Sequence, residues 1–195
     1  MTAYKLFGIT LGVALIGGAL QAQDWSIETF LRAIETPAHD VLMEGVQQPG
    51  VTLVAFETDG CSGGLSQAWR AMSSTFPKFA EAHQSRPPWE DCCVTHDRAY
   101  HNAGGALEAA ASFDARLAAD TTLRSCVAAS AGDRVEALSE MYDLSAAQIE
   151  SAYAQIAQTM FLVVRFGGAP CTDLPWRWGF GYPSCCRGLA AFRDY

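Results

Sequence analysis

Basic residues are scarce in this chain. Its 195 residues contain 13 lysines and arginines against 21 aspartates and glutamates, which gives a formal net charge of -8 at pH 7. An acidic chain is repelled by the phosphate backbone of nucleic acids and by anionic lipid surfaces. The composition therefore argues against a nucleic-acid-binding protein and against electrostatic docking on anionic membranes. Zwitterionic lipids and small molecules stay open as ligands.

Long apolar runs are scarce as well. After residue 22, no stretch approaches the roughly 18 uninterrupted apolar residues of a transmembrane helix, so we expect a soluble protein without a stable transmembrane anchor. Residues 6–20 are almost wholly apolar but short and glycine-rich, and they follow Lys5. Such a segment is typical of a secretory signal peptide, which we predict to span residues 1–22 with cleavage after Ala22. The remaining residues, 23–195, are enough for a single secreted or periplasmic domain.

The sequence also lacks the alternation of apolar and polar residues that marks a half-buried strand. No such run is long enough to predict a sheet, and there is no internal repeat. Helical spacing of apolar residues predicts an all-α fold instead, with an irregular, aromatic tail from Pro170. The expected helices are residues 26–36 ended by Pro37, 66–82 interrupted at Pro77, a helix starting after Pro88, 106–129, and 145–165 behind a capping box. Residues 176–182 suit a lipid-facing patch or a core equally well.

Cysteines are numerous, but no Cys-x-x-Cys pair occurs among them. The seven are Cys61, Cys92, Cys93, Cys126, Cys171, Cys185 and Cys186. In an exported chain, such cysteines indicate a disulfide framework with one thiol left over. A zinc site at Cys92, Cys93 and His96 is the weaker reading, because adjacent cysteines chelate one ion poorly.

Residues 92–100, Cys-Cys-Val-Thr-His-Asp-Arg-Ala-Tyr, are the most informative stretch. On a helix, His96 and Tyr100 share one face at i and i+4, while Asp97 points about 100° away from His96. The pattern resembles the catalytic helix of secreted phospholipases A2, which reads Cys-Cys-x-x-His-Asp-x-x-Tyr. The resemblance covers roughly residues 58–126, and it implies two antiparallel, disulfide-linked long helices.

The resemblance also assigns roles to individual residues. His96 would be the general base that activates water, assisted by Tyr100, and an aspartate on the second long helix would orient it. Asp114, which lies 18 residues after His96, is the match for that aspartate. Asp120 is the runner-up, and we interpret it as a solvated or capping acid.

Thr58-Asp59-Gly60-Cys61-Ser62-Gly63-Gly64 is similar to the calcium loop of the same family. Calcium binds six to eight oxygens, and a glycine-rich loop can turn carbonyl groups toward one point. By the resemblance, Asp59 and Asp97 would give carboxylates and Gly60 a carbonyl. An ordinary Asp-Gly turn is the alternative for this loop taken alone.

Three disulfides are expected on the same grounds. Cys61 would pair with Cys93, tying the loop to the catalytic helix, and Cys92 with Cys126, tying the two long helices. Cys171 would pair with Cys185 or Cys186.

The activity that the resemblance implies is calcium-dependent hydrolysis of the sn-2 ester of glycerophospholipids at a membrane or micelle surface. Two other classes stay open, namely a catalytically silent calcium-binding module on this scaffold and a disulfide-rich exported binding protein without metal. A serine hydrolase built on Ser66 has weak support, because the segment around it lacks the final glycine of a nucleophile elbow.

Overall fold

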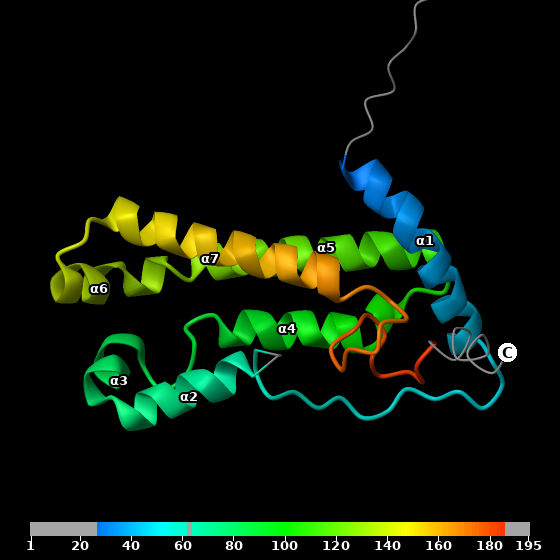
Figure 1. Cartoon of the computed structure of the whole chain (residues 1–195), viewed down its shortest axis with the longest axis horizontal. Helices are drawn as coiled ribbons and strands as arrows, with labels where there is room; N and C mark the ends of the chain where they lie inside the picture. The colour runs from blue at the N-terminus through cyan, green and yellow to red at the C-terminus, as the bar shows by residue number, and fades with distance from the viewer. Residues whose placement is uncertain (1–26, 62–63, 186–195) are drawn as a thin grey trace, which may run out of the picture.

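The structure, a computed structural model, describes residues 27–61 and 64–185 (Figure 1). Helices are the only regular elements in these residues, with no strand, which confirms the all-α prediction. The elements are α1 (Ile27–Val46), α2 (Leu65–Thr75), α3 (Pro77–His83), α4 (Glu90–His101), η1 (Ala103–Gly105), α5 (Ala109–Ala129), η2 (Gly132–Arg134), α6 (Val135–Tyr142) and α7 (Ala146–Gly167). The predicted signal peptide and Cys186 lie outside the described residues. None of the described helices is long and apolar enough to cross a bilayer.

The helix α5 is the centre of the arrangement, because it packs against α1, α4 and α7 (Figure 1). Its end is joined to the start of α4 by the disulfide Cys92–Cys126, so the two helices run antiparallel, as predicted. The predicted Cys61–Cys93 bridge is also present and fastens the preceding loop to α4. In the tail, Cys171 pairs with Cys185.

Helix starts follow local sequence signals. Ser145 and Gln148 form the predicted capping box of α7, in which each residue bonds to the backbone N–H of the other. Pro77 is the first residue of α3, where its missing N–H costs no hydrogen bond, so it separates α3 from α2. Glu90 and Asp91 occupy the first turn of α4, where carboxylates interact favourably with the helix dipole.

The prediction that Pro37 ends the first helix is wrong, because α1 continues through it to Val46. A proline inside a helix costs about 3 kcal/mol. The residues beyond it bury Leu42 and Met43, which are 1% and 3% exposed. Burial of two such side chains contributes about 1.5–3 kcal/mol each, enough to offset the proline. The short helix α6 was not predicted at all.

Two hydrophobic clusters meet along α4. Cys92 and Cys93 belong to one cluster, which α5, α6 and α7 complete. Tyr100 belongs to the other, together with Leu42 of α1 and the fully buried Trp178 of the tail. The tail aromatic at 178 is therefore core rather than a lipid-facing patch. Residues 96 and 97 lie on α4 between the two clusters.

Candidate active site

His96 and Tyr100 stack on the buried face of α4. Their ring centroids are 4.1 Å apart, and the side chains are 7% and 1% exposed. This is the i, i+4 contact that the sequence predicted. Because Tyr100 covers one face of the imidazole, the ring can contact an acceptor or a ligand only through its two nitrogens.

The acceptor on α5 is Asp120, so the prediction that Asp114 orients His96 is wrong. His96 Nε2 lies 2.8 Å from Asp120 Oδ1. Asp114 instead accepts a hydrogen bond from Arg32 of α1 at 2.5 Å, and its side chain is 60% exposed.

The register of the two helices explains this correction. The Cys92–Cys126 bridge places the later part of α5 opposite the start of α4, and the chain reverses through η1 before α5 begins at Ala109. Asp114 is six residues before Asp120, or about 9 Å along the helix axis, and so lies beyond the reach of His96.

Asp120 is fully buried, and all three of its neighbours donate hydrogen bonds to it. Oδ1 accepts from His96 and from the Tyr100 hydroxyl at 2.7 Å, while Oδ2 accepts from Arg165 Nη1 at 2.9 Å. Burial raises the pKa of Asp120, but the hydrogen bond from His96 and the charge of Arg116 lower it more, so the net pKa lies below its ordinary value. Asp120 is therefore an anion and acts as an acceptor.

The tautomer of His96 follows from its contact with an anionic acceptor. Nε2 must carry the proton that is donated to Asp120, so in the neutral ring Nδ1 has the free lone pair. Burial lowers the pKa of His96, but the hydrogen bond to Asp120 and the neighbouring Asp97 raise it more, and the net pKa lies above its ordinary value. Nδ1 is 3.8 Å from Asp97 Oδ1.

His96 and Asp97 line a cavity of about 310 Å³ whose other walls are mostly apolar. The remaining lining residues are Cys61, Leu65, Cys93, Leu123, Thr159, Met160, Val163, Val164 and Trp176. A base with a free lone pair thus lies at the wall of an apolar cavity, an arrangement typical of ligand and active sites.

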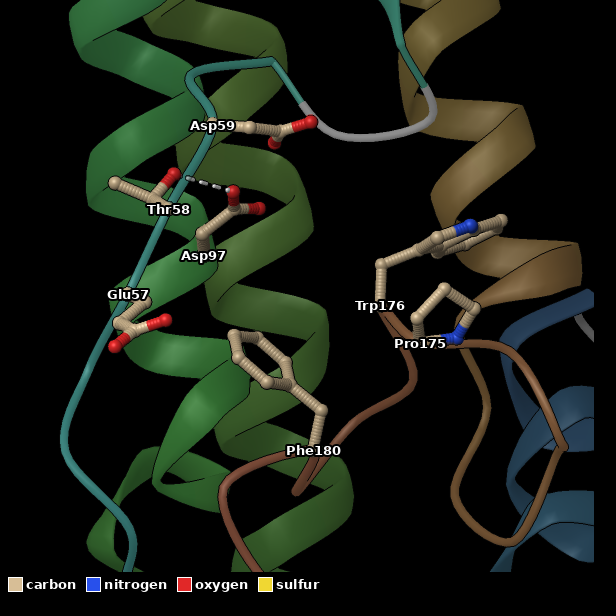
Figure 2. A pocket seen from close by; sticks show the side chains of 7 residues that line it. All are labelled: Glu57, Thr58, Asp59, Asp97, Pro175, Trp176 and Phe180. Carbon is tan, nitrogen blue, oxygen red and sulfur yellow. Dashed lines mark hydrogen bonds between the residues drawn. The ribbon is translucent and has the colours of Figure 1, made fainter.

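Asp97 also faces a second, more polar cavity of about 400 Å³ (Figure 2). Glu57, Thr58 and Asp59 line it on the loop side, and Pro175, Trp176 and Phe180 of the tail lie opposite. Trp176 is common to both cavities, so the apolar and the acidic cavity are neighbours.

The loop backbone is fixed against α4 by several contacts. The Thr58 hydroxyl donates to Asp97 Oδ2 at 3.2 Å and accepts from the Gly60 N–H at 3.2 Å. Gly60 has a φ of 98°, and a Cβ there would lie 2.5 Å from Ser66 Oγ, so only glycine fits. Ser66 is itself fully buried and donates to Glu90 at 2.6 Å, which makes it a support of the loop rather than an accessible nucleophile.

The donors around the acidic cavity fit calcium in their chemistry, because Asp97, Asp59 and Glu57 are all hard oxygen ligands. Glu57 was not singled out in the sequence. In the described part of the chain, no three acidic, histidine or cysteine side chains converge on one point. Of the predicted ligands, Asp59 and Asp97 line the cavity, and the Gly60 carbonyl lies 3.3 Å from the Thr58 hydroxyl. These three residues do not form a closed coordination shell.

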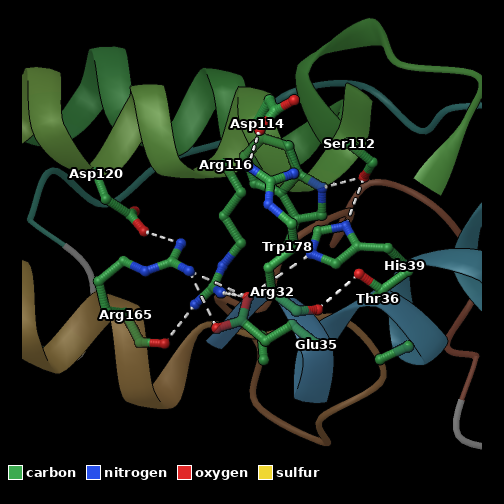
Figure 3. Close-up of polar contacts among 12 residues, drawn as sticks. Arg32, Glu35, Thr36, His39, Ser112, Asp114, Arg116, Asp120, Arg165 and Trp178 are labelled. Atoms are coloured by element: carbon green, nitrogen blue, oxygen red, sulfur yellow. Dashed lines mark hydrogen bonds and ion pairs between the residues drawn. The ribbon is translucent and has the colours of Figure 1, made fainter. Parts of the chain in front are cut away.

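A buried polar network continues from Asp120 into α1 and α7 (Figure 3). Arg165 bonds to Glu35 at 3.0 Å, and Glu35 also pairs with Arg116. Beyond Glu35, His39 Nδ1 lies 2.8 Å from Ser112 Oγ. A serine, a histidine and a carboxylate thus follow one another, but His39 and Ser112 have no exposed surface, and no substrate can reach them.

No protein-family model, curated protein or solved structure matches this chain.

Proposed function

We propose that this protein is a hydrolase of the secreted phospholipase A2 kind, in which His96 activates a water molecule against the sn-2 ester of a glycerophospholipid. The observation that carries the proposal is the His96–Asp120 hydrogen bond. Because Nε2 donates to Asp120, Nδ1 is the proton acceptor of the ring. His96 lines the apolar cavity, and the acidic cavity lies next to it. The sequence motif of α4 supports the same reaction.

In the proposed reaction, His96 Nδ1 accepts a proton from a water molecule while the water oxygen attacks the ester carbonyl carbon. The bond from that carbon to the glycerol oxygen then breaks, and the imidazolium returns its proton to the leaving oxygen. The products are a fatty acid and a lysophospholipid. Asp120 stabilises the imidazolium through Nε2, and no side chain forms a covalent intermediate.

The two cavities suit the two ends of such a substrate. The apolar cavity, walled by Met160, Val163 and Leu123 among others, suits an acyl chain. The acidic cavity suits a cation that in turn attracts a phosphate group. The net charge of -8 favours zwitterionic over anionic lipid surfaces.

The cofactor that fits this proposal is calcium, with Asp97 and Asp59 as carboxylate ligands and the Gly60 carbonyl beside them. When bound, calcium supplies positive charge for the phosphate and for the developing oxyanion. The loop residue Thr58 holds the Asp97 carboxylate in place at 3.2 Å.

The test is release of fatty acid from phosphatidylcholine vesicles, labelled in the sn-2 chain, by the purified protein with calcium or with a chelator. We expect hydrolysis only with calcium, and a loss of at least about a hundredfold in His96→Gln, the usual scale for a general base. His83→Gln is a matched control, because His83 bonds to Tyr142 far from the cavities. It should retain full turnover.

Other results would separate the remaining classes. Calcium binding, seen by calorimetry, without hydrolysis of any ester would identify a silent calcium-binding module. Absence of both binding and hydrolysis would favour a disulfide-rich binding protein. Equal turnover by His96→Gln and the parent protein would refute the assignment of His96.

A further inference from the structure

We propose that Arg165 and Glu35 are positioning residues for His96: Arg165 fixes the Asp120 carboxylate that orients the imidazole, and Glu35 fixes Arg165. The effect of these residues on turnover rests on the proposed function, whereas their effect on the geometry of His96 does not. Neither residue touches the cavities, so each would act only through its neighbour.

The first step is the contact between Arg165 and Asp120. The two hydrogen bonds of Asp120 Oδ1, to His96 and Tyr100, use one oxygen, and Arg165 Nη1 holds the other at 2.9 Å. Because three donors bond to its two oxygens, the Asp120 carboxylate is held in one orientation. Without Arg165, Oδ2 would lose its hydrogen-bond donor while the carboxylate stayed fully buried, so only the two bonds of Oδ1 would orient it.

The second step is the contact between Glu35 and the two arginines. Glu35 Oε1 and Oε2 lie 3.0 and 3.2 Å from Arg165 Nη2, and Oε2 also pairs with Arg116. Arg116 donates to the Tyr100 hydroxyl at 3.2 Å and to the carbonyl of residue 165 at 2.7 Å. Glu35 therefore links the two side chains that contact the Asp120–Tyr100 pair.

Charge balance supports a role beyond packing. Glu35, Asp120, Arg116 and Arg165, which we call the buried charge cluster, carry two negative and two positive charges and are at most 7% exposed. Loss of the Glu35 charge would leave two buried guanidinium groups against the single carboxylate of Asp120, so Arg165 would be held less firmly.

Three helices besides α4 supply the side chains that hold the orientation of His96. Glu35 comes from α1, Asp120 from α5 and Arg165 from the last turn of α7 (Figure 3). Displacement of α1 or α7 would thus alter the acceptor of His96 even if α4 and α5 kept their disulfide.

The experiment compares Glu35→Gln, Arg165→Gln and Arg165→Lys in the full-length oxidised protein. Arg134→Gln is the matched control, because Arg134 is a buried arginine that donates to the Ala82 carbonyl, away from His96. Two readouts are used: kcat and KM on phosphatidylcholine vesicles with calcium, and the NMR signal of the His96 Nε2–H proton in protein with ¹⁵N-labelled histidine.

We expect Glu35→Gln and Arg165→Gln to lower kcat by about tenfold to a hundredfold with little change in KM, the scale of a small misplacement of a catalytic group. The Nε2–H signal should shift upfield and exchange faster with water in both. Arg165→Lys, which keeps the positive charge, should restore part of kcat and of the signal. The control should lower thermal stability alone.

The outcomes distinguish the two proposals. If the parent protein hydrolyses no lipid but the Nε2–H signal changes as expected, the positioning roles stand and the proposed function fails. Unchanged kcat and an unchanged signal in folded Glu35→Gln and Arg165→Gln would refute the positioning roles. If Arg165→Gln does not fold, Arg165→Lys and the near-isosteric Glu35→Gln decide the matter by the same two readouts.

Discussion

Replacement of Asp120 by asparagine is the most direct perturbation of the site, with Asp114→Asn as its matched partner on the same helix. Asp120→Asn removes the charge from a buried acceptor of three hydrogen bonds, including one from Arg165. Removing one member of a buried ion pair costs about 3–5 kcal/mol, because the other charge stays buried without a partner. Asp114 is 60% exposed in its pair with Arg32, and an exposed pair contributes about 1 kcal/mol or less.

The assay is thermal unfolding of the oxidised protein at pH 7, followed by circular dichroism. For a domain of this length, 1 kcal/mol corresponds to about 2–4 °C in Tm, so Asp120→Asn should lower Tm by about 6–20 °C and Asp114→Asn by less than about 4 °C. Turnover should fall by at least about a hundredfold in Asp120→Asn, because the amide no longer stabilises the imidazolium. If Asp114→Asn lost as much stability and turnover as Asp120→Asn, the assignment of Asp120 to His96 would be wrong.

Three further predictions test other parts of the structure. Added calcium should raise Tm in the parent protein, because a ligand that binds only the folded state stabilises it, and Asp97→Asn should remove most of that gain in the same melting experiment. Glu35 and Asp120 both have a pKa below the ordinary value, as burial is outweighed by their histidine and arginine partners. Their stabilisation is therefore complete above the unfolded-state pKa and is lost as the pH falls through the folded-state pKa. Urea unfolding at pH 3 and pH 7 should show this loss, and it should be smaller in Asp120→Asn; an equal loss would contradict the pairing. Gly60→Ala should destabilise the protein by about 1–3 kcal/mol in urea unfolding, because its φ of 98° and the nearby Ser66 hydroxyl exclude a Cβ.

Local signals in the sequence predicted the elements whose ends are set by local chemistry. The capping box at Ser145, the break at Pro77 and the helix that carries His96 and Asp97 all lie where they were expected. Pro37 was misjudged because tertiary packing outweighed a local rule. Tertiary packing also buries His101, which is 4% exposed, since the tail folds over it and the Gly181 N–H donates to its backbone carbonyl.

The candidate site was predictable only as far as α4 and the loop. His96, Tyr100 and Asp97 follow from one short motif, and the pairing of Cys61 with Cys93 places the loop beside them. Asp120 was passed over for Asp114, because spacing along the chain does not give the register between two helices. Glu35 and Arg165 are 130 residues apart, and only the folded contact of α1 with α7 reveals their role.

The adjacent half-cystines Cys92 and Cys93 have a consequence for oxidative folding. They form disulfides with cysteines on different elements. The sequence separations are 34 residues for Cys92 and 32 for Cys93, so the two disulfides close loops of similar length. Loop-closure entropy therefore hardly distinguishes the native pairing from the isomer in which the two partners are exchanged. Neighbouring helix residues point about 100° apart, so the exchanged isomer would turn α4 about its own axis and carry His96 away from Asp120. Selection between the two isomers must then come from side chains of α4, and refolding should require a thiol that allows disulfides to reshuffle.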